Sequence, residues 1–309
     1  MYDGVTLIGL PYQFGRRGGG TGYQMACGPE VLMASDAVPS RVGDWCEDVE
    51  RVWLDDLDEP EDPPQQGRPT WPAGDQMTRQ LAQNNGLARA VREATSRGRL
   101  PVISAGGCNS SLGVVAGLSD PLMSMFWFDA HADAQTPDTT TEGLFEGMPV
   151  STIAGQCWPH YREQVEGFRV IPESRIASVG MHDTRFIQPW DKQRQGLGTL
   201  VDPQAIAELG FEGAMSVAVE ALSRQTSVTY VHIDTDVIDP EHMRGHHHTA
   251  PGGPTPDQII WAVERIAADM RIAAVNFTCY DPTVDERART VLPPLVSEVA
   301  RVAMGSKRA

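Results

Sequence analysis

The segment FWFDAHADAQTP, residues 126–137, joins a short apolar run to three ionisable residues at alternate positions, Asp129, His131 and Asp133. An apolar run of this length predicts a buried strand. If the backbone stays extended beyond the strand, the three side chains point to the same side of it. The segment therefore predicts a strand with a cluster of ionisable side chains at its carboxyl end.

A second segment, VHIDTDVIDP at residues 231–240, repeats this arrangement with Asp234 and Asp236. The carboxyl ends of parallel strands meet at one edge of a sheet, where carboxylates would repel one another unless cations lay between them. Oxygen ligands with one imidazole suit Mn²⁺, and two ions ~3.5–4 Å apart can hold a bridging hydroxide as a nucleophile. Aspartates are also common turn residues at strand ends, but two such clusters in one chain favour the two-metal site.

Short apolar runs alternate with amphipathic stretches along the chain, which predicts an α/β fold around a mostly parallel sheet. The proline- and glycine-rich segment 59–74 is expected to be a surface loop within a single domain, residues 1–309. The predicted strands are 5–10, 100–104, 125–130, 175–181, 229–234 and 272–278. The predicted helices are 75–97, 110–118, 203–223, 255–269 and 285–304.

The chain has 309 residues and a formal net charge of −16, which argues against nucleic acid or an anionic membrane as a partner. A small-molecule substrate is expected instead. The N-terminus MYDGVTLIGL lacks the basic region of a signal peptide, and no apolar run approaches the length of a membrane span. The five cysteines are odd in number and form no close pair in the sequence, unlike a secreted disulfide framework. We therefore expect a cytoplasmic protein.

The chain resembles the ureohydrolase family, which includes arginases, agmatinases and formiminoglutamases. The likeness rests on the DAHxD and DxDxxDP segments and on SAGGCNSSLG at 104–113, with weaker matches at GLPYQFG, CGPEVL, GMHD and PGG. It implies a three-layer α/β/α fold, usually oligomeric, and a dimanganese centre that hydrolyses guanidino or related C–N bonds. We therefore expect a homo-oligomer.

The resemblance also implies a role for each metal-ligand candidate. Asp129 and Asp234 would bridge the two ions. His131 and Asp236 would bind one ion, and Asp133 would bind the other. Asp133 would also hold the bridging hydroxide, which makes it a catalytic candidate.

The glycine turn departs from the family pattern, which usually reads GGDHS with the histidine as a metal ligand. Aligned on Gly113, this chain places Cys108 at the histidine position, and a shift of one residue places Asn109 there. A thiolate can bind a divalent metal, but sulfur shifts the preference from Mn²⁺ toward Fe, Co, Ni or Zn. Some arginase-like hydrolases of N-hydroxyarginine are similar in carrying a cysteine at this position. The alternative is a buried structural thiol.

The substrate-binding positions also differ from those of arginases. Where arginases have Asn, Ser and Asn for the α-carboxylate and a proton-shuttling histidine, this chain has Gln135, Glu142, Leu144 and Glu146. Glutamates would repel a carboxylate, so free arginine is disfavoured and a cationic substrate is favoured. Glu146, at the histidine position, is the second catalytic candidate. Asp183, in GMHD, matches the family aspartate that holds a substrate amine.

The family's guanidinium-binding glutamate is also absent. The chain reads FTCYDP there, so Cys279, or Thr278 in a different register, takes the substrate-binding position. A guanidinium would lose a charge-assisted partner worth roughly 1.5–3 kcal/mol. Glu146 or Asp281 would replace that partner, or the scissile group is not a guanidinium. Glu286 lies too far along the chain and is expected near the start of the last helix.

The run GHHHTAPGG at 245–253 follows the second aspartate segment. One of His246, His247 and His248 would be able to replace the proton shuttle, because histidine titrates near neutrality. We favour the alternative that all three are solvated loop residues. His232 is interpreted as a hydrogen-bonded histidine at a strand end.

Together these features predict a metal-dependent hydrolase that cleaves a C–N bond of a guanidino, amidino or related amide group. The alternatives are an N-hydroxyarginine-type hydrolase and a non-catalytic metal-binding relative with the same fold. The cofactors are expected to be two divalent ions, Mn²⁺ before Fe, Co, Ni or Zn.

Overall fold

The structure is a computed structural model, and it describes residues 2–13, 23–57, 76–140, 143–185 and 196–307. These residues contain an eight-stranded sheet with the strand order β2-β1-β3-β8-β7-β4-β5-β6, in which all neighbouring strands are parallel. The strands are β1 (Gly4–Leu10), β2 (Val49–Trp53), β3 (Arg99–Ala105), β4 (Ser124–Asp129), β5 (Ile176–Gly180), β6 (Thr199–Val201), β7 (Val228–Asp234) and β8 (Arg271–Thr278).

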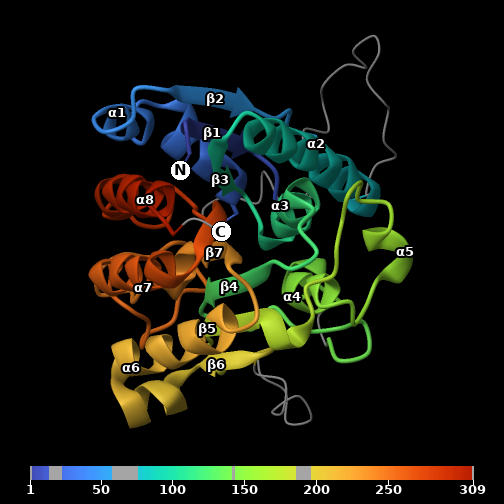
Figure 1. Cartoon of the computed structure of the whole chain (residues 1–309), viewed down its shortest axis with the longest axis vertical. Coiled ribbons are helices and arrows are strands. Elements are labelled where there is room, and N and C mark those ends of the chain that lie inside the picture. The colour runs from blue at the N-terminus through green and yellow to red at the C-terminus, as the bar shows by residue number, and fades with distance from the viewer. Residues whose placement is uncertain (1, 14–22, 58–75, 141–142, 186–195, 308–309) are drawn as a thin grey trace.

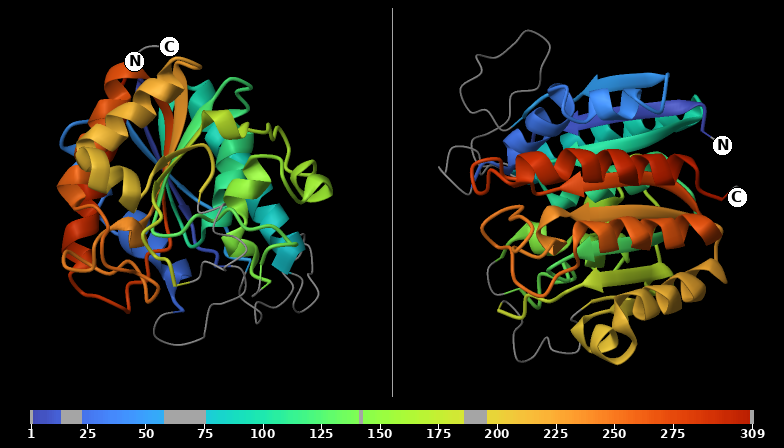
Figure 2. Two further views of the ribbon diagram at one scale, coloured as in Figure 1. Left: turned by 90° about the horizontal axis from the view of Figure 1, so that it is seen from below. Right: turned by 90° about the vertical axis from the view of Figure 1, so that its left-hand side faces the viewer.

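Helices cover both faces of the sheet, as Figures 1 and 2 show. They are α1 (Pro39–Gly43), α2 (Gln76–Ser96), α3 (Ser111–Leu118), α4 (Pro149–Ile153), α5 (Pro159–Arg162), α6 (Pro203–Ser223), α7 (Pro256–Asp269) and α8 (Ala288–Met304). In Figure 1, α1, α6, α7 and α8 lie on one side of the sheet and α2 to α5 on the other. The expected three-layer α/β/α fold is confirmed, and its sheet is wholly parallel.

Each face of the sheet has its own apolar core. Along β4, Phe126 and Phe128 pack into the core beneath α6, α7 and α8, whereas Met125 and Trp127 pack into the core beneath α2, α3 and α4. All four side chains are fully buried. Burial on both faces explains why the strand reads as a continuous apolar run, as is typical of parallel sheets.

The sequence predicted the central elements but missed the edges. All six predicted strands and all five predicted helices are present, although α8 begins at Ala288 rather than at 285 and α6 is kinked at Gly210, where φ is 71°. The edge strands β2 and β6 were missed because one is half-exposed and the other has three residues. The short helices α1, α4 and α5 were missed as well, and the predicted loop 59–74 lies outside the described residues.

The strand order decides where the chemistry of the chain is concentrated. After β3 the chain crosses to β4 and leaves a gap, into which the later strands β7 and β8 insert. The four strands β3, β8, β7 and β4 are therefore neighbours at the centre of the sheet, although the segments are far apart in the sequence. Their carboxyl ends meet at one edge, where open α/β sheets bind ligands.

The packed sheet centre makes a direct prediction for stability. Leu100 in β3 is fully buried beneath the α6–α8 layer, so Leu100→Ala should lower the free energy of unfolding by about 2–5 kcal/mol. Leu122 is 66% exposed, so Leu122→Ala is the matched control and should change it by less than about 0.5 kcal/mol. Urea denaturation measures both, and equal effects would contradict this description of the core.

Candidate metal centre

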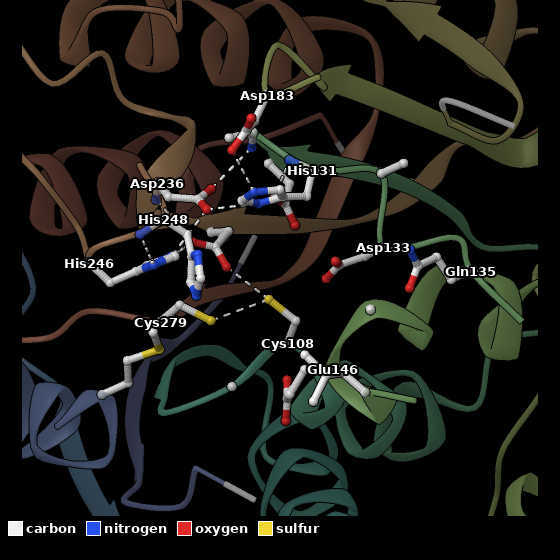
Figure 3. A pocket seen from close by; sticks show the side chains of 18 of the residues that line it. Cys108, His131, Asp133, Gln135, Glu146, Asp183, Asp236, His246, His248 and Cys279 are labelled. Atoms are coloured by element: carbon white, nitrogen blue, oxygen red, sulfur yellow. Dashed lines mark hydrogen bonds and ion pairs between the residues drawn. The ribbon is translucent and has the colours of Figure 1, made fainter. Parts of the chain in front are cut away.

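A cavity of about 200 Å³ opens at the carboxyl edge of the four central strands. The strands contribute to it in turn: β3 leads to Cys108, β4 to Asp129, β7 to Asp234 and β8 to Cys279. Figure 3 shows the side chains that converge on this cavity. The two aspartate segments that define the sequence pattern therefore meet, as expected for parallel strands.

The segment after β4 holds its ionisable side chains in fixed positions. The Asp129 carboxylate accepts hydrogen bonds from the indole of Trp127 at 3.0 Å and from the backbone N–H of His131 at 2.7 Å. The backbone does not stay extended as far as Asp133, whose φ is 47°. The Asp133 side chain nevertheless lines the cavity, and Figure 3 shows its carboxylate pointing into it.

The segment after β7 turns at once into a short 3₁₀-helix, Thr235–Val237. One Asp234 oxygen accepts the backbone N–H of Asp236 at 2.9 Å, and Asp236 in turn accepts the backbone N–H of Ala130 at 3.1 Å. The second hydrogen bond ties the two aspartate segments together. Each carboxylate keeps another oxygen available for the interior of the cluster.

His131 and His246 lie between these carboxylates. His131 Nδ1 is 3.3 Å from an Asp129 oxygen and 3.0 Å from an Asp236 oxygen. His246 Nε2 is 3.1 Å from the same Asp236 oxygen and 3.5 Å from an Asp234 oxygen. The carboxylates and the two imidazoles thus form one contiguous cluster, of which His246 is only 4% exposed.

Burial and mutual repulsion dominate the electrostatics of this cluster. Burial, and then the charges of Asp236 and Asp234, raise the pKa of Asp129 from 3.8 to about 7. The pKa of Asp133 is also raised well above its ordinary value, first by burial and then by Asp129. Burial alone would lower the pKa of His246, but the neighbouring Asp236 and Asp234 outweigh it and raise this pKa from 6.5 to about 10. The cluster therefore favours bound positive charge, whether protons or cations.

The glycine turn places Cys108, not Asn109, in the cavity. Cys108 Sγ is 2.9 Å from an Asp234 oxygen and 3.5 Å from Cys279 Sγ. Asn109 is fully buried, and neither polar atom of its side-chain amide has a hydrogen-bond partner within the described chain. The geometry thus favours the alignment that put the cysteine at the ligand position.

Thr278, the alternative to Cys279, is fully buried and does not line the cavity. Its hydroxyl is 3.3 Å from Cys108 Sγ and 3.3 Å from His232 Nε2. His232 is fully buried, stacks on the Trp127 ring with centroids 3.5 Å apart, and pairs through Nδ1 with the Ser111 hydroxyl at 2.9 Å. The interpretation of His232 as a hydrogen-bonded histidine at a strand end agrees with these contacts.

The predicted substrate aspartate, Asp183, lines the cavity but is already engaged. Arg185 donates to both of its oxygens, from Nε at 2.8 Å and from Nη2 at 2.6 Å, and His131 Nε2 lies 3.2 Å away. Although burial raises the pKa of Asp183, these hydrogen bonds outweigh it and hold the pKa well below the usual range. A substrate amine at this carboxylate would have to share it with a guanidinium.

The other predicted substrate positions lie on the opposite wall. Gln135, Leu144 and Glu146 line the cavity, whereas Glu142 lies outside the described residues. The Glu146 carboxylate lies against the glycine turn, where a Cβ on Gly107 would come within 2.8 Å of it. It is also 3.5 Å from the backbone N–H of Asn109. Glu146 therefore contacts the start of the helical segment that carries Cys108.

The remaining acidic alternatives do not reach the cavity. Asp281 is fully buried and binds the backbone N–H of Gln24 at 2.9 Å and the hydroxyl of Thr283 at 2.6 Å. Glu286 pairs with Arg289 at 3.2 Å on the surface, just before α8. Asp281 thus anchors a loop and is not placed to replace the missing guanidinium partner.

The histidine run was interpreted wrongly. His246 is buried against Asp234 and Asp236, His248 lines the cavity, and only His247 is exposed. The sequence gives one signal that was undervalued, because a histidine cluster in the loop after a DxD strand lies at the same sheet edge as the carboxylates. His246 is therefore a ligand candidate, although its place in the sequence predicted a solvated loop residue.

The donor atoms fit divalent cations. One compact group consists of Asp129, His131 and Asp236, and another of Asp234, Asp236 and His246, with the donor atoms of each within 4.8 Å of one another. Cys108 belongs to two further groups, one with Asp234 and Cys279 and one with Asp129 and His232. Among the described residues no such group includes Asp133, so its role as a ligand stays a prediction. Oxygen and imidazole donors with two thiols can together serve two ions.

Comparisons with known proteins support the same class. The model of the Arginase family matches residues 3–304. An arginase of Bacillus caldovelox is 26% identical over 312 residues, which cover 98% of this chain and 97% of that protein. The crystal structure of arginase from Bacillus caldovelox superposes with a TM-score of 0.78 at 23% identity, over 100% of this chain and 99% of that one. The crystal structure of formimidoylglutamase from Bacillus subtilis superposes with a TM-score of 0.71 at 18% identity, over 99% of this chain and 88% of that one.

The chain belongs to the arginase family, the ureohydrolases, as the resemblance of its motifs implied. The family and the fold support a metal-dependent amidinohydrolase that acts on a small molecule. Within the described ranges, no helix has both the length and the apolar character needed to cross a membrane.

The cluster predicts how stability changes with pH when metal is removed. Between the ordinary pKa of 3.8 and the folded value of about 7, folded Asp129 holds a proton that the unfolded chain has lost. Between its ordinary pKa of 6.5 and its folded pKa of about 10, folded His246 likewise holds a proton that the unfolded chain has lost. Both contributions are lost as the pH rises. Below pH 6.5 the lowered pKa values of His232 and His248 act in the opposite direction, so the melting temperature of chelator-treated protein should fall from pH 7 to pH 9, where His246 dominates.

Calorimetry in high salt, which screens the surface charges, measures this fall. Added divalent metal should reverse most of it, because cations replace the protons. Asp129→Asn removes a contribution that decreases up to about pH 7, so between pH 5 and pH 7 its profile should rise relative to that of the natural chain. A melting temperature of the metal-free natural chain that rises from pH 7 to pH 9 would contradict this description of the cluster.

Proposed function

We propose that the chain hydrolyses a C–N bond of a guanidino, amidino or related amide group in a small cationic substrate. One observation supports this most strongly: Asp129, Asp234 and Asp236 meet two imidazoles inside a small cavity. Such a set is stable only with positive charge among the carboxylates, and two divalent ions would provide it. Cytoplasmic location and a homo-oligomeric state stay predictions.

When bound, the two ions would lower the pKa of a water molecule held between them and so supply hydroxide near neutral pH. Asp129 and Asp234 are the bridging candidates, since they end adjacent strands and are held by hydrogen bonds to Trp127 Nε1 and the Asp236 backbone. Asp133 points into the same cavity with a raised pKa. A carboxyl with that property can hold the nucleophile's proton and pass it to the leaving amine.

The walls of the cavity support a cationic substrate. Asp133, Glu146 and Asp183 all line a space of about 200 Å³, which is small. Acidic walls repel a substrate carboxylate and attract an ammonium or guanidinium group. An agmatine-like guanidine is therefore favoured over free arginine.

Arg185 favours a second candidate, hydrolysis of an N-hydroxyarginine-like amino acid. Its guanidinium neutralises Asp183 and also donates to the backbone carbonyl of His248, which lines the cavity, at 2.9 Å. A guanidinium near a cavity rim can bind a substrate carboxylate. This second candidate predicts turnover of amino acids that carry a free carboxylate. The first candidate, a cationic agmatine-like substrate, does not predict it.

A substrate screen with metal-loaded protein tests the proposal. Agmatine and guanidinobutyrate are compared with arginine, N-hydroxyarginine and formiminoglutamate in the presence of Mn²⁺, Fe²⁺, Co²⁺, Ni²⁺ or Zn²⁺. The product measured is urea from agmatine, guanidinobutyrate and arginine, hydroxyurea from N-hydroxyarginine, and formamide from formiminoglutamate. We expect the highest kcat/KM for agmatine. Asp129→Asn should abolish turnover and lower the metal content of the protein, and Asp133→Asn should lower kcat by about 10²–10⁴-fold.

Asp138→Asn is the matched control, because Asp138 is an exposed aspartate in the same loop. It should leave turnover and metal content unchanged. Preference for N-hydroxyarginine would favour the second candidate. Absence of hydrolysis with every substrate and metal would favour a non-catalytic metal-binding protein and overturn the proposal.

A further inference from the structure

Two thiols face each other in the cavity, at positions where the usual family pattern has a metal-binding histidine and a guanidinium-binding glutamate. Cys108 Sγ and Cys279 Sγ are 3.5 Å apart, and both residues are buried. They follow the neighbouring strands β3 and β8, whose register pairs Ala105 with Thr278. Figure 3 shows the two sulfur atoms pointing toward one another. Residues 171 apart in the sequence are thus brought together by the fold.

The backbone at Cys279 is strained in a way that serves this arrangement. Its φ is 62°, a left-handed conformation that is unfavourable for a non-glycine residue. The backbone N–H of Cys279 donates to the carbonyl of Ala105 at 3.2 Å and so fixes the residue beside β3. Retained strain in a cavity wall is typical of functional positions.

The separation of the sulfurs suits a shared metal ion better than a disulfide. Two thiolates on one tetrahedral ion, each about 2.3 Å from it, lie about 3.8 Å apart. A disulfide would require about 2.05 Å. The observed 3.5 Å is within a few tenths of an ångström of the first geometry.

A third donor completes the group. An Asp234 oxygen lies 2.9 Å from Cys108 Sγ, and the donor atoms of Cys108, Cys279 and Asp234 all fall within 4.8 Å of one another. The 2.9 Å contact is a hydrogen bond, and a bound ion would widen it to about 3.5 Å. That change requires a shift of only about half an ångström in a side chain.

We propose that Cys108, Cys279 and Asp234 form a thiophilic subsite that selects Zn²⁺ over Mn²⁺. The group of Asp129, His131 and Asp236 offers only oxygen and nitrogen ligands, which suit Mn²⁺ or a similar ion. Binding forms two Zn–S bonds and releases one proton from each thiol to solvent. Cys279 is then a metal ligand instead of the substrate contact that the sequence predicts. The inference rests on the two-ion centre of the proposed function.

Cobalt titration of the reduced, metal-free protein tests the subsite without using activity. Co²⁺ bound by thiolates gives an intense sulfur-to-metal charge-transfer band in the near ultraviolet, which oxygen and nitrogen ligands do not give. We expect this band in the natural protein, about half its intensity in Cys279→Ser or Cys108→Ser, and none in the double variant. Zn²⁺ should displace the band at equimolar concentration, and Mn²⁺ should not.

Cys157→Ser is the matched control. Cys157 is also buried, but its sulfur contacts the hydroxyls of Ser151 at 3.3 Å and Thr152 at 3.4 Å near α4, away from the cavity residues. This variant should keep the full band. Circular dichroism of each variant separates a lost ligand from a lost fold, and Cys279→Ser remains informative if Cys108→Ser does not fold.

A natural protein that binds cobalt without the band, or a band unchanged in folded Cys279→Ser, would overturn the proposal. The proposal would also be overturned if Cys108 and Cys279 form a disulfide in the metal-free protein, so that two titratable thiols are lost, and the cobalt charge-transfer band never appears. Turnover without the band contradicts only the thiophilic subsite. The band without turnover of any substrate contradicts only the proposed function.

Discussion

The repulsion among buried carboxylates is the interaction on which the rest of the site depends. Asp129, Asp234 and Asp236 end or follow adjacent strands and have little contact with solvent. Burial, and then the charges of Asp236 and Asp234, raise the pKa of Asp129 to about 7, so a buried carboxyl here favours its neutral form unless positive charge lies beside it. The two imidazoles partly compensate, and divalent ions would complete the compensation. The site is thus a charge cluster that favours bound positive charge, which divalent ions would supply under the proposed function.

The fold makes this cluster possible by the order of its strands. Insertion of β7 and β8 between β3 and β4 brings four distant segments to one sheet edge. Hydrogen bonds then restrict each carboxylate, including the bond from the Ala130 backbone to Asp236 that joins two segments. A rigid scaffold of this kind holds ligands in place before an ion arrives.

The sequence predicted the fold well because the central strands are buried on both faces and read as apolar runs. It also predicted that the two aspartate segments would meet, since alternation and strand ends follow from backbone geometry. It could not decide whether the side chain of Cys108 or that of Asn109 enters the cavity. The two alignments of the glycine turn differ by one residue, and tertiary contacts determine which side chain points inward. Nor could it predict the contact of Cys108 with Cys279 or the burial of His246, which arise from long-range packing. The pairing of Arg185 with Asp183 is a local contact that was not predicted, because the match to the family motif assigned Asp183 to a substrate amine.

The central claim is that two ions occupy this cluster, one among oxygen and imidazole donors and one beside the thiols. Anomalous X-ray diffraction from crystals grown with both Mn²⁺ and Zn²⁺, recorded at the two absorption edges, tests it most directly. The account predicts a manganese peak between Asp129, His131 and Asp236, and a zinc peak bonded to Cys108 and Cys279. One metal in both positions would contradict the selectivity of the thiols, and no peak among the carboxylates would contradict the metal centre itself.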